Sequence, residues 1–234
     1  MTQTTADRAM IVTRDTTPDT QANYAFSNNL VVISDPNGVD AESISALRNH
    51  LTASHLNEGR RGLTISAPNA ADGALWLAAN LAVALAQSGV RTLLVDCDLR
   101  SGGLEKLIQP HDAIVGLSEL LEDRKMSLSN VVRSNVVRNL SVIYAGTPSD
   151  NAQQLVFGPQ MARAFDLCLR DFDLTIAVPP PAKQRADARR IALLTHYALV
   201  VGRKDQTLLA DLKTLIAEFR ADGVNVIGSV YNGS

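Results

Sequence analysis

The stretch Ser66–Leu75 has the arrangement of a phosphate-binding loop, with an apolar strand, a short loop and then a helix. The pattern for such a loop is G-x-x-x-x-G-K-[ST], in which the lysine contacts phosphate and the hydroxyl binds Mg²⁺. Gly73 stands at the last glycine of the pattern, while Ala74 and Leu75 stand at the lysine and hydroxyl positions. The stretch therefore has the frame of a phosphate loop without its phosphate-binding and metal-binding side chains.

The two replacements at the start of this helix have different chemical consequences. Loss of the lysine removes a charge-assisted contact worth roughly 1.5–3 kcal/mol, or about ten- to a hundredfold in affinity. Leu75 has no oxygen atom, and Mg²⁺ requires oxygen ligands. The helix N-terminus keeps its backbone N–H groups and partial positive charge, which make a modest anion site. We therefore expect no cofactor in this chain.

Two carboxylates, Asp96 and Asp98, follow the next apolar strand and could serve the same site. They are either metal ligands or polar residues at a strand end that faces solvent, and both interpretations stay open. Without a lysine nearby, two carboxylates would repel a triphosphate. The sequence thus predicts at most a vestigial nucleotide site at Gly73, Asp96 and Asp98.

Alternating strand and helix patterns must position these residues. Strands are predicted over 63–67, 91–97, 140–145, 174–178, 197–202 and 224–230, and the main helices over 41–55, 73–87, 152–170, 185–194 and 207–220. Strands that are continuous apolar runs are typical of a parallel sheet covered on both faces. The alternation predicts one α/β domain over residues 29–234, a doubly wound, mostly parallel sheet with helices on both faces. Residues 1–28, rich in Thr, Asp, Gln and Asn, are predicted to be a flexible arm.

The composition narrows the class of protein. With 46% hydrophobic residues and a net charge of −2, the chain is globular and has no general attraction to nucleic acid. Cys97 and Cys168 have no metal-type spacing and predict neither a metal site nor a disulfide framework, which fits a reducing cytoplasm. The most apolar helix, 73–89, is shorter than the ~20 residues that cross a bilayer. We expect a cytoplasmic chain that does not cross a membrane.

Two motifs resemble a known family. The run Asn80–Gly89 and the following Leu94–Arg100 (LVDCDLR) are similar to the bacterial tyrosine kinases of capsule and exopolysaccharide systems, a branch of the MinD/ParA-like P-loop ATPases. That family's second motif, LLVDADLR or Walker A′, is matched except for Cys97. Together with Ala145-Gly146 and the closing Tyr231–Gly233, the resemblance covers about residues 30–234. It implies a P-loop NTPase-like fold.

The chain departs from this family at two further sites. The family's Walker B motif, YDYVIIDTPP, aligns with Phe172–Pro180 and places Val178 at the metal-side aspartate. The family's oligomerisation helix, E-x-x-R-x-x-R, is represented by Glu42, Ser45 and Arg48, without the central arginine. Glu42 and Arg48 are therefore candidate partner contacts.

Two more segments near the Walker B position allow different interpretations. Arg189 and Arg190 are either a solvated helix face or contacts for an acidic or phosphorylated partner. The run Pro179–Pro181 is expected to be an exposed, extended segment.

The resemblance and the lost residues together predict a non-catalytic regulator or scaffold in exopolysaccharide or capsule biosynthesis and export. By analogy with the family, it would dock on a membrane polysaccharide co-polymerase on a separate chain, at the inner membrane, and homo-oligomers are left open. The alternative is an active ATPase or protein tyrosine kinase that binds ATP and Mg²⁺ with a non-standard loop. That alternative requires a lysine from elsewhere, such as Lys183 or a partner subunit. A ParA-like positioning factor meets the same objection.

Overall fold

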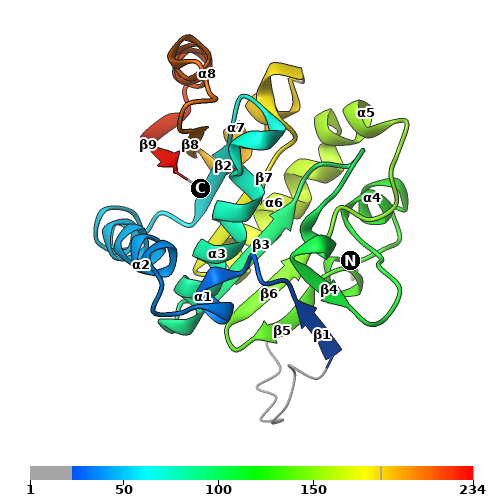
Figure 1. Cartoon of the computed structure of the whole chain (residues 1–234). Helices are drawn as coiled ribbons and strands as arrows, with labels where there is room; N and C mark the ends of the chain where they lie inside the picture. Colours follow the sequence, from blue (N-terminus) through cyan, green and yellow to red (C-terminus); the bar gives the residue numbers. More distant parts are fainter. Residues whose placement is uncertain (1–22, 185, 234) are drawn as a thin grey trace.

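A computed structural model describes residues 23–184 and 186–233 and shows a seven-stranded sheet with helices on both faces (Figure 1). The strands lie in the order β5-β6-β3-β7-β2-β8-β9, and all pair in parallel except β5. Their bounds are β2 Gly62–Ser66, β3 Thr92–Asp96, β5 Arg133–Val137, β6 Leu140–Ile143, β7 Leu174–Val178, β8 Tyr197–Arg203 and β9 Asn225–Asn232. The predicted doubly wound, mostly parallel α/β architecture is confirmed.

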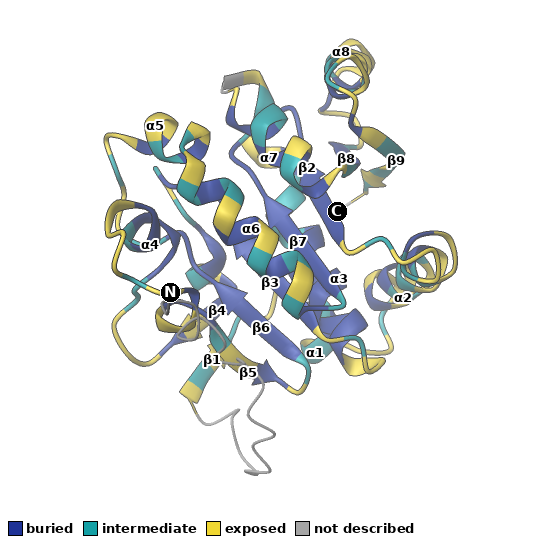
Figure 2. Ribbon diagram, turned by 180° about the vertical axis from the view of Figure 1, so that it is seen from behind, coloured by how far each residue is buried: buried dark blue, intermediate teal, exposed yellow. Residues whose placement is uncertain are grey.

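The helices form a layer on each face of the sheet. One layer holds α1 (Val31–Ser34), α2 (Val39–Leu51) and α3 (Ala74–Gln87). The other holds α4 (Leu117–Glu122), α5 (Ala152–Phe157), α6 (Pro159–Asp171), α7 (Asp187–Thr195) and α8 (Leu209–Ala221). The central strands β2, β3, β6 and β7 are entirely buried (Figure 2), which explains why they read as continuous apolar runs.

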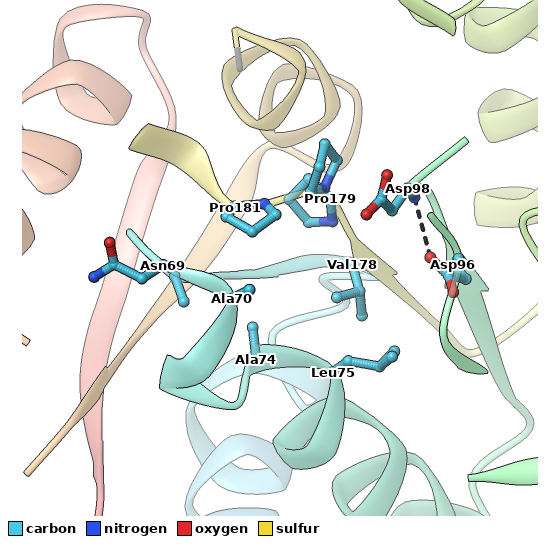
Figure 3. Close-up of a pocket in the computed structure, with 12 residues that line it drawn as sticks. Asn69, Ala70, Ala74, Leu75, Asp96, Asp98, Val178, Pro179 and Pro181 are labelled. Carbon is cyan, nitrogen blue, oxygen red and sulfur yellow. Dashed lines mark hydrogen bonds between the residues drawn. The ribbon is translucent and has the colours of Figure 1, made fainter. Parts of the chain in front are cut away.

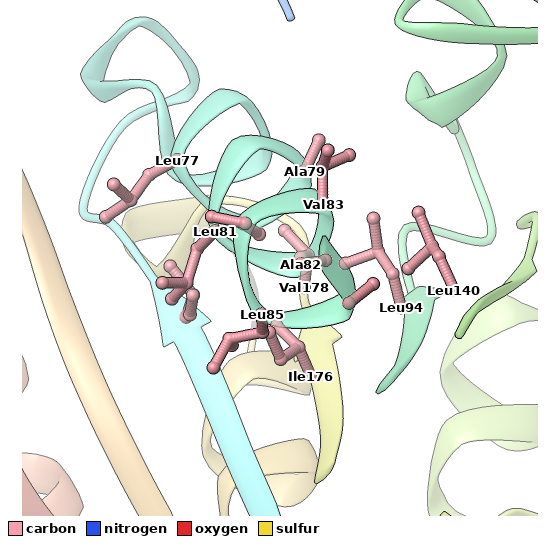
Figure 4. Close-up of a cluster of buried hydrophobic side chains, with 14 of the residues drawn as sticks. Leu77, Ala79, Leu81, Ala82, Val83, Leu85, Leu94, Leu140, Ile176 and Val178 are labelled. Atoms are coloured by element: carbon pink, nitrogen blue, oxygen red, sulfur yellow. The ribbon is translucent and has the colours of Figure 1, made fainter. Parts of the chain in front are cut away.

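The core is centred on α3, whose apolar side chains pack between α2 and the sheet. Leu81 and Leu85 lie among Leu94 of β3 and Ile176 of β7 (Figure 4). Complete burial of such a side chain stabilises the fold by roughly 1.5–3 kcal/mol. By length and composition the segment Ala70–Gln87 matches a membrane span, with a mean hydropathy of 1.2, but 61% of it is buried inside the domain. Its apolar character is that of a core helix.

Two predicted elements differ from the structure. The helix expected over 152–170 is divided into α5 and α6 at Gly158, where the backbone is extended, and Pro159 begins α6. Proline has no N–H to continue the first helix, yet it fits the first turn of the second. The antiparallel strand β5 was not predicted, because its residues RSNVV are polar at the start and its pairing with β6 contains a register shift.

The N-terminal part of the described chain forms a small two-stranded sheet. Strand β1 (Tyr24–Phe26) pairs antiparallel with β4 (Ile108–Pro110). This strand lies within the stretch 1–28 that the sequence assigns to a flexible arm, so the paired structure begins before residue 29. The rest of the predicted arm, residues 1–22, lies outside the described residues.

Candidate functional site

The carboxyl ends of β2, β7 and β3, which are neighbours in the sheet, meet around one cavity of about 150 Å³ (Figure 3). This volume is below the ~300–1,000 Å³ that is usual for small-molecule sites. The residues that line it are Ala67, Asn69, Ala70, Ala74, Leu75, Asp96, Asp98, Gly102, Val178, Pro179, Pro180 and Pro181. The structure therefore brings together five of the six site positions named from the sequence, and Gly73 is the exception.

Gly73 begins α3 in a left-handed conformation, with φ of 85°. A Cβ atom at this position would come within 2.6 Å of the side-chain nitrogen of Asn232, at the end of β9. Both the positive φ and this close approach require glycine. Local geometry thus explains Gly73 without any contact to phosphate.

The two positions that follow Gly73 present apolar groups. Leu75 packs against the loop after β3, where a Cβ on Gly103 would lie 3.0 Å from its Cδ2 atom. Val178, at the end of β7, is buried in the core cluster that contains α3. Figure 3 shows Ala74, Leu75 and Val178 on one side of the cavity. The three positions that would carry the ammonium, hydroxyl and carboxylate of a working site form a hydrocarbon wall.

The loop before α3 is closed by its own carboxylate. Asp72 is buried, and its Oδ2 accepts the backbone N–H of Asn69 at 2.8 Å. Its Oδ1 accepts the hydroxyl of Thr207, between β8 and α8, at 2.5 Å. The Thr207 oxygen in turn accepts the N–H of Arg203 at 2.7 Å. In a working phosphate loop the backbone encloses the phosphate of a ligand. Here the loop bonds to the carboxylate of its own Asp72, which also connects it to the segment that leads into α8.

This tie predicts a measurable loss of stability when the Thr207 hydroxyl is removed. Thr207→Val keeps the shape of the side chain but leaves the buried Asp72 carboxylate without one donor. We expect the free energy of unfolding in urea to fall by about 1–2 kcal/mol. The matched control is Thr214→Val on α8, whose exposed hydroxyl bonds only within the helix; it should change stability by less than about 0.5 kcal/mol. Equal losses of stability in Thr207→Val and Thr214→Val would contradict a stabilising bond between Thr207 and Asp72.

Asp96 holds the loop after β3 from inside the protein. Its Oδ1 accepts the N–H of Asp98 at 3.0 Å, and its Oδ2 accepts the N–H of Leu104 at 3.1 Å. Burial raises the pKa of Asp96 to about 7, and the nearby charges of Asp98 and Glu105 act in the same direction. The carboxyl thus holds its proton more tightly than an ordinary aspartate. The interpretation of Asp96 as a residue that faces solvent is wrong.

Asp98 is the more accessible of the two carboxylates and lines the cavity. Its Oδ1 accepts the N–H groups of Arg100 and Ser101 at 3.2 and 3.3 Å, which fixes the turn of the loop. The guanidinium of Arg100 then pairs with the buried carboxylate of Asp187 at the start of α7. Within residues 23–184 and 186–233, no group of three or more His, Cys, Asp or Glu side chains is arranged to hold a metal ion.

The proline run after β7 is packed inside the protein. Pro179 and Pro180 are buried, so the expectation of an exposed segment is wrong for both. The chain just beyond them is hydrogen-bonded to the phosphate loop: the N–H of Ala182 donates to Ala67 at 2.9 Å, and that of Lys183 donates to Pro68 at 3.1 Å. The Lys183 ammonium pairs with Asp211 of α8 at 2.8 Å.

The candidate partner contacts lie on opposite faces of the sheet. On α2, Glu42 is exposed and the guanidinium of Arg48 bonds to the Asn49 side chain. On α7, Arg189 forms two hydrogen bonds of 2.6 Å with the carboxylate of Asp222, while Arg190 is half-buried. The two groups therefore do not form one surface.

Sequence reasoning missed three contacts that shape the site. The Asn69–Asp72 contact had a readable signal, because Asn followed three residues later by an acidic residue is typical of a helix start. The bond from Thr207 and the Arg100–Asp187 pair join positions 135 and 87 residues apart. Nothing local in the sequence indicates such distant pairs.

Comparison with known proteins places this geometry in a family. The chain is 35% identical over 196 residues to the tyrosine-protein kinase ptk of Acinetobacter johnsonii, a match that covers 82% of the chain. The kinase domain of the Escherichia coli tyrosine kinase ETK superimposes with a TM-score of 0.81 at 25% identity, over 87% of this chain and 79% of that domain. The chain belongs to the bacterial tyrosine kinase family. The BceF tyrosine kinase domain agrees, with a TM-score of 0.78 at 28% identity over 87% of this chain and 81% of that domain.

The match covers only part of ptk. The chain spans 26% of the length of ptk. No protein-family model matches the chain. Within this bacterial tyrosine kinase fold, the two segments that carry the resemblance, Asn80–Gly89 and Leu94–Arg100, belong to α3 and to the end of β3. The cavity is lined by the start of α3 and by Asp96 and Asp98 at the end of β3.

Proposed function

We propose that this chain is a non-catalytic member of the bacterial tyrosine kinase family that acts as a regulator or scaffold in exopolysaccharide or capsule biosynthesis and export. The observation that carries the proposal is the hydrocarbon wall formed by Ala74, Leu75 and Val178. Phosphoryl transfer depends on positioned cations that neutralise charge on the transferred group. A wall of three apolar side chains supplies neither a cation nor a metal ligand.

The two remaining carboxylates support the same proposal. Both Asp96 oxygens are occupied by backbone N–H groups, and its pKa of about 7 reduces its negative charge at neutral pH. Asp98 accepts the backbone N–H of Arg100 in the turn that follows it. Each carboxylate thus has a structural role in this chain that needs no metal.

The proposed mode of action is docking on a membrane polysaccharide co-polymerase carried by a separate chain. The protein would be cytoplasmic and held at the inner membrane through that partner. The face of α2 around Glu42 and Arg48 corresponds to the family's oligomerisation helix, and Arg189 and Arg190 on α7 remain the second candidate contact, where a partner would compete with Asp222 for Arg189. A net charge of −2 does not favour nucleic acid as a partner.

Calorimetry with ATP and ADP, with and without Mg²⁺, tests the proposal directly. We expect no binding heat at millimolar nucleotide and no hydrolysis above the buffer rate, because the cavity lacks the lysine at position 74 and the oxygen ligands at positions 75 and 178. Millimolar ATP binding with hydrolysis that Asp96→Ala abolishes would overturn the proposal. Co-purification with the cytoplasmic part of the co-polymerase, in the absence of nucleotide, is the expected positive result.

The alternative is an active ATPase or protein tyrosine kinase, which the retained acidic pair Asp96 and Asp98 favours. It needs a lysine from outside the loop. The Lys183 ammonium is paired with Asp211 and does not line the cavity, so a partner subunit would have to supply the cation. Phosphotyrosine on the chain or its partner, formed only when both are present with ATP, would establish this alternative.

A further inference from the structure

The strand β9 forms one edge of the main sheet and is poorly protected against further pairing. It is eight residues long and reads NVIGSVYN, with neither a charge nor a proline. It is the last strand in the sheet order, and no other strand of residues 23–184 or 186–233 pairs with its outer side (Figure 1). Natural edge strands are usually blunted by charges, prolines or short length. A bare edge of this kind is a template for another strand.

The hydrogen bonds to β8 determine which backbone groups of β9 point outward. The carbonyl of Asn232 accepts the N–H of Lys204, which follows β8, so the backbone of Asn232 faces β8. Backbone groups alternate in direction along a strand, and the register with β8 is regular from Gly228 to Asn232. The N–H and carbonyl groups of Ser229 and Tyr231 therefore point away from the sheet.

The side chain of Tyr231 lies on the α8 face of this edge. Tyr231 is opposite Gly202 of β8, and a Cβ on Gly202 would meet Leu212 of α8 at 2.9 Å. Side chains of paired residues share a face, so Tyr231 and Ser229 both point to the α8 side. Tyr231 is 55% exposed, although it is the largest side chain of the strand.

We propose that β9 pairs antiparallel with β9 of a second copy of this chain, about a two-fold axis at Val230. In this register each outward Ser229 stands opposite the outward Tyr231 of the other copy, and such a pair exchanges both of its backbone hydrogen bonds. The two Val230 residues face each other at the closer, non-hydrogen-bonded spacing. The Tyr231 ring then covers the small side chain of the other copy's Ser229.

The lack of charge favours a second copy over a foreign strand, and the register of the edge is compatible with self-pairing. When an uncharged strand pairs with itself, no like charges face each other. The same strand has no charge that could attract an oppositely charged foreign strand. The axis at Val230 matches outward residues with outward residues, as antiparallel pairing requires. The register shift between Ala198 and Leu199 ends the regular edge at Gly228 and limits the pairing to five residues. The contact is isologous, so it closes at a dimer and does not propagate.

This dimer is independent of the cavity. Its residues lie on the sheet edge and include neither Ala74, Leu75 and Val178 nor the α2 helix that resembles the family's oligomerisation motif. Its formation therefore does not rest on the proposed loss of catalysis, and nucleotide should leave it unchanged.

Sedimentation equilibrium of the whole chain and three Ser229 variants tests the proposal. Ser229→Pro removes an outward N–H and no bond to β8, and Ser229→Lys places a charge on the edge while the N–H remains. Ser229→Ala is the matched control, because it keeps the N–H and is small enough to lie under Tyr231. We expect a concentration-dependent dimer for the wild type and Ser229→Ala, and at least a tenfold weaker dimer for Ser229→Pro and Ser229→Lys.

Thermal melts by circular dichroism show whether each variant is folded, so the lysine variant keeps the test valid if the proline variant unfolds. A wild type that stays monomeric at about 100 µM would overturn the proposal. A dimer that persists in folded Ser229→Lys would also overturn it, because the two copies would then meet elsewhere. Binding of a co-polymerase strand at β9 by a monomeric chain would count against a second copy as the occupant.

Discussion

Ala74→Lys is expected to raise the affinity for ATP by about ten- to a hundredfold over its uncharged counterpart, Ala74→Met. Ala74 lines the cavity at the start of α3, so a lysine there can reach an anion held by the helix N-terminus. A charge-assisted hydrogen bond to phosphate contributes roughly 1.5–3 kcal/mol. Calorimetric or fluorescent-nucleotide titration at two salt concentrations gives the affinities and shows whether the gain is electrostatic.

Ala74→Met matches lysine in length and controls for filling of the cavity. Adding Leu75→Thr and Val178→Asp to Ala74→Lys should introduce dependence on Mg²⁺, because the two changes supply oxygen ligands. Val178 is buried, so the aspartate should destabilise the free protein and be rescued in part by Mg²⁺ and ATP. Identical affinities of the lysine and methionine variants would show that the closed loop excludes phosphate whatever stands at position 74.

Wild-type stability should rise as the pH is lowered from 8 to 5, relative to Asp96→Asn. The pKa of Asp96 is raised to about 7 by burial, from 3.8 in the unfolded chain. Between these two values the folded state holds a proton that the unfolded state has lost, so lowering the pH favours folding. At about 1.4 kcal/mol per pKa unit, the difference between the two free energies of unfolding should change by about 3 kcal/mol. Urea titrations at each pH measure it.

Glu119 provides a control of opposite sign. Burial tends to raise its pKa, but hydrogen bonds from Thr147 and Gly116 outweigh burial and hold the pKa below its ordinary value. The stability that this carboxylate contributes is present above its unfolded pKa and is lost as the pH falls through the folded value. The difference between wild type and Glu119→Gln should thus stay flat from pH 8 to 5 and fall only below the unfolded pKa of 4.5. A wild-type to Asp96→Asn difference that is flat from pH 8 to 5 would contradict a raised Asp96 pKa.

Most of the fold could be predicted from the sequence because apolar strands and helical patterns alternate along the chain. The same pattern placed Asp96 and Val178 at strand ends and Ala74 and Leu75 at the start of the helix after β2, and neighbouring parallel strands bring these positions together. Strand β5 was missed because its polar residues show no strand period. The break at Gly158 was readable from the proline that follows it, although the apolar pattern continues across the break.

The closure of the site could not be predicted, because it depends on contacts between distant segments. Burial of Pro179 follows from how the chain after β7 packs on the phosphate loop, and the proline run by itself is compatible with an exposed segment. In the sequence, Asp72 looks like an ordinary residue of a helix start. Its bond to Thr207 is evident only in the folded structure. Sequence order shows which residues occupy a site, while tertiary packing decides which of them still face its interior.

The bond between Asp72 and Thr207 has a consequence for signalling. In a nucleotide switch, phosphate release frees the loop and that loss is transmitted to distant surfaces. In the proposed non-catalytic chain the anion would be part of the chain itself, so the loop and the segment that leads into α8 would stay joined whether or not nucleotide is present. A partner that docks on this domain would meet one constant shape. The domain would then signal only through the amount of it that is present, because its docking surface would not change with nucleotide.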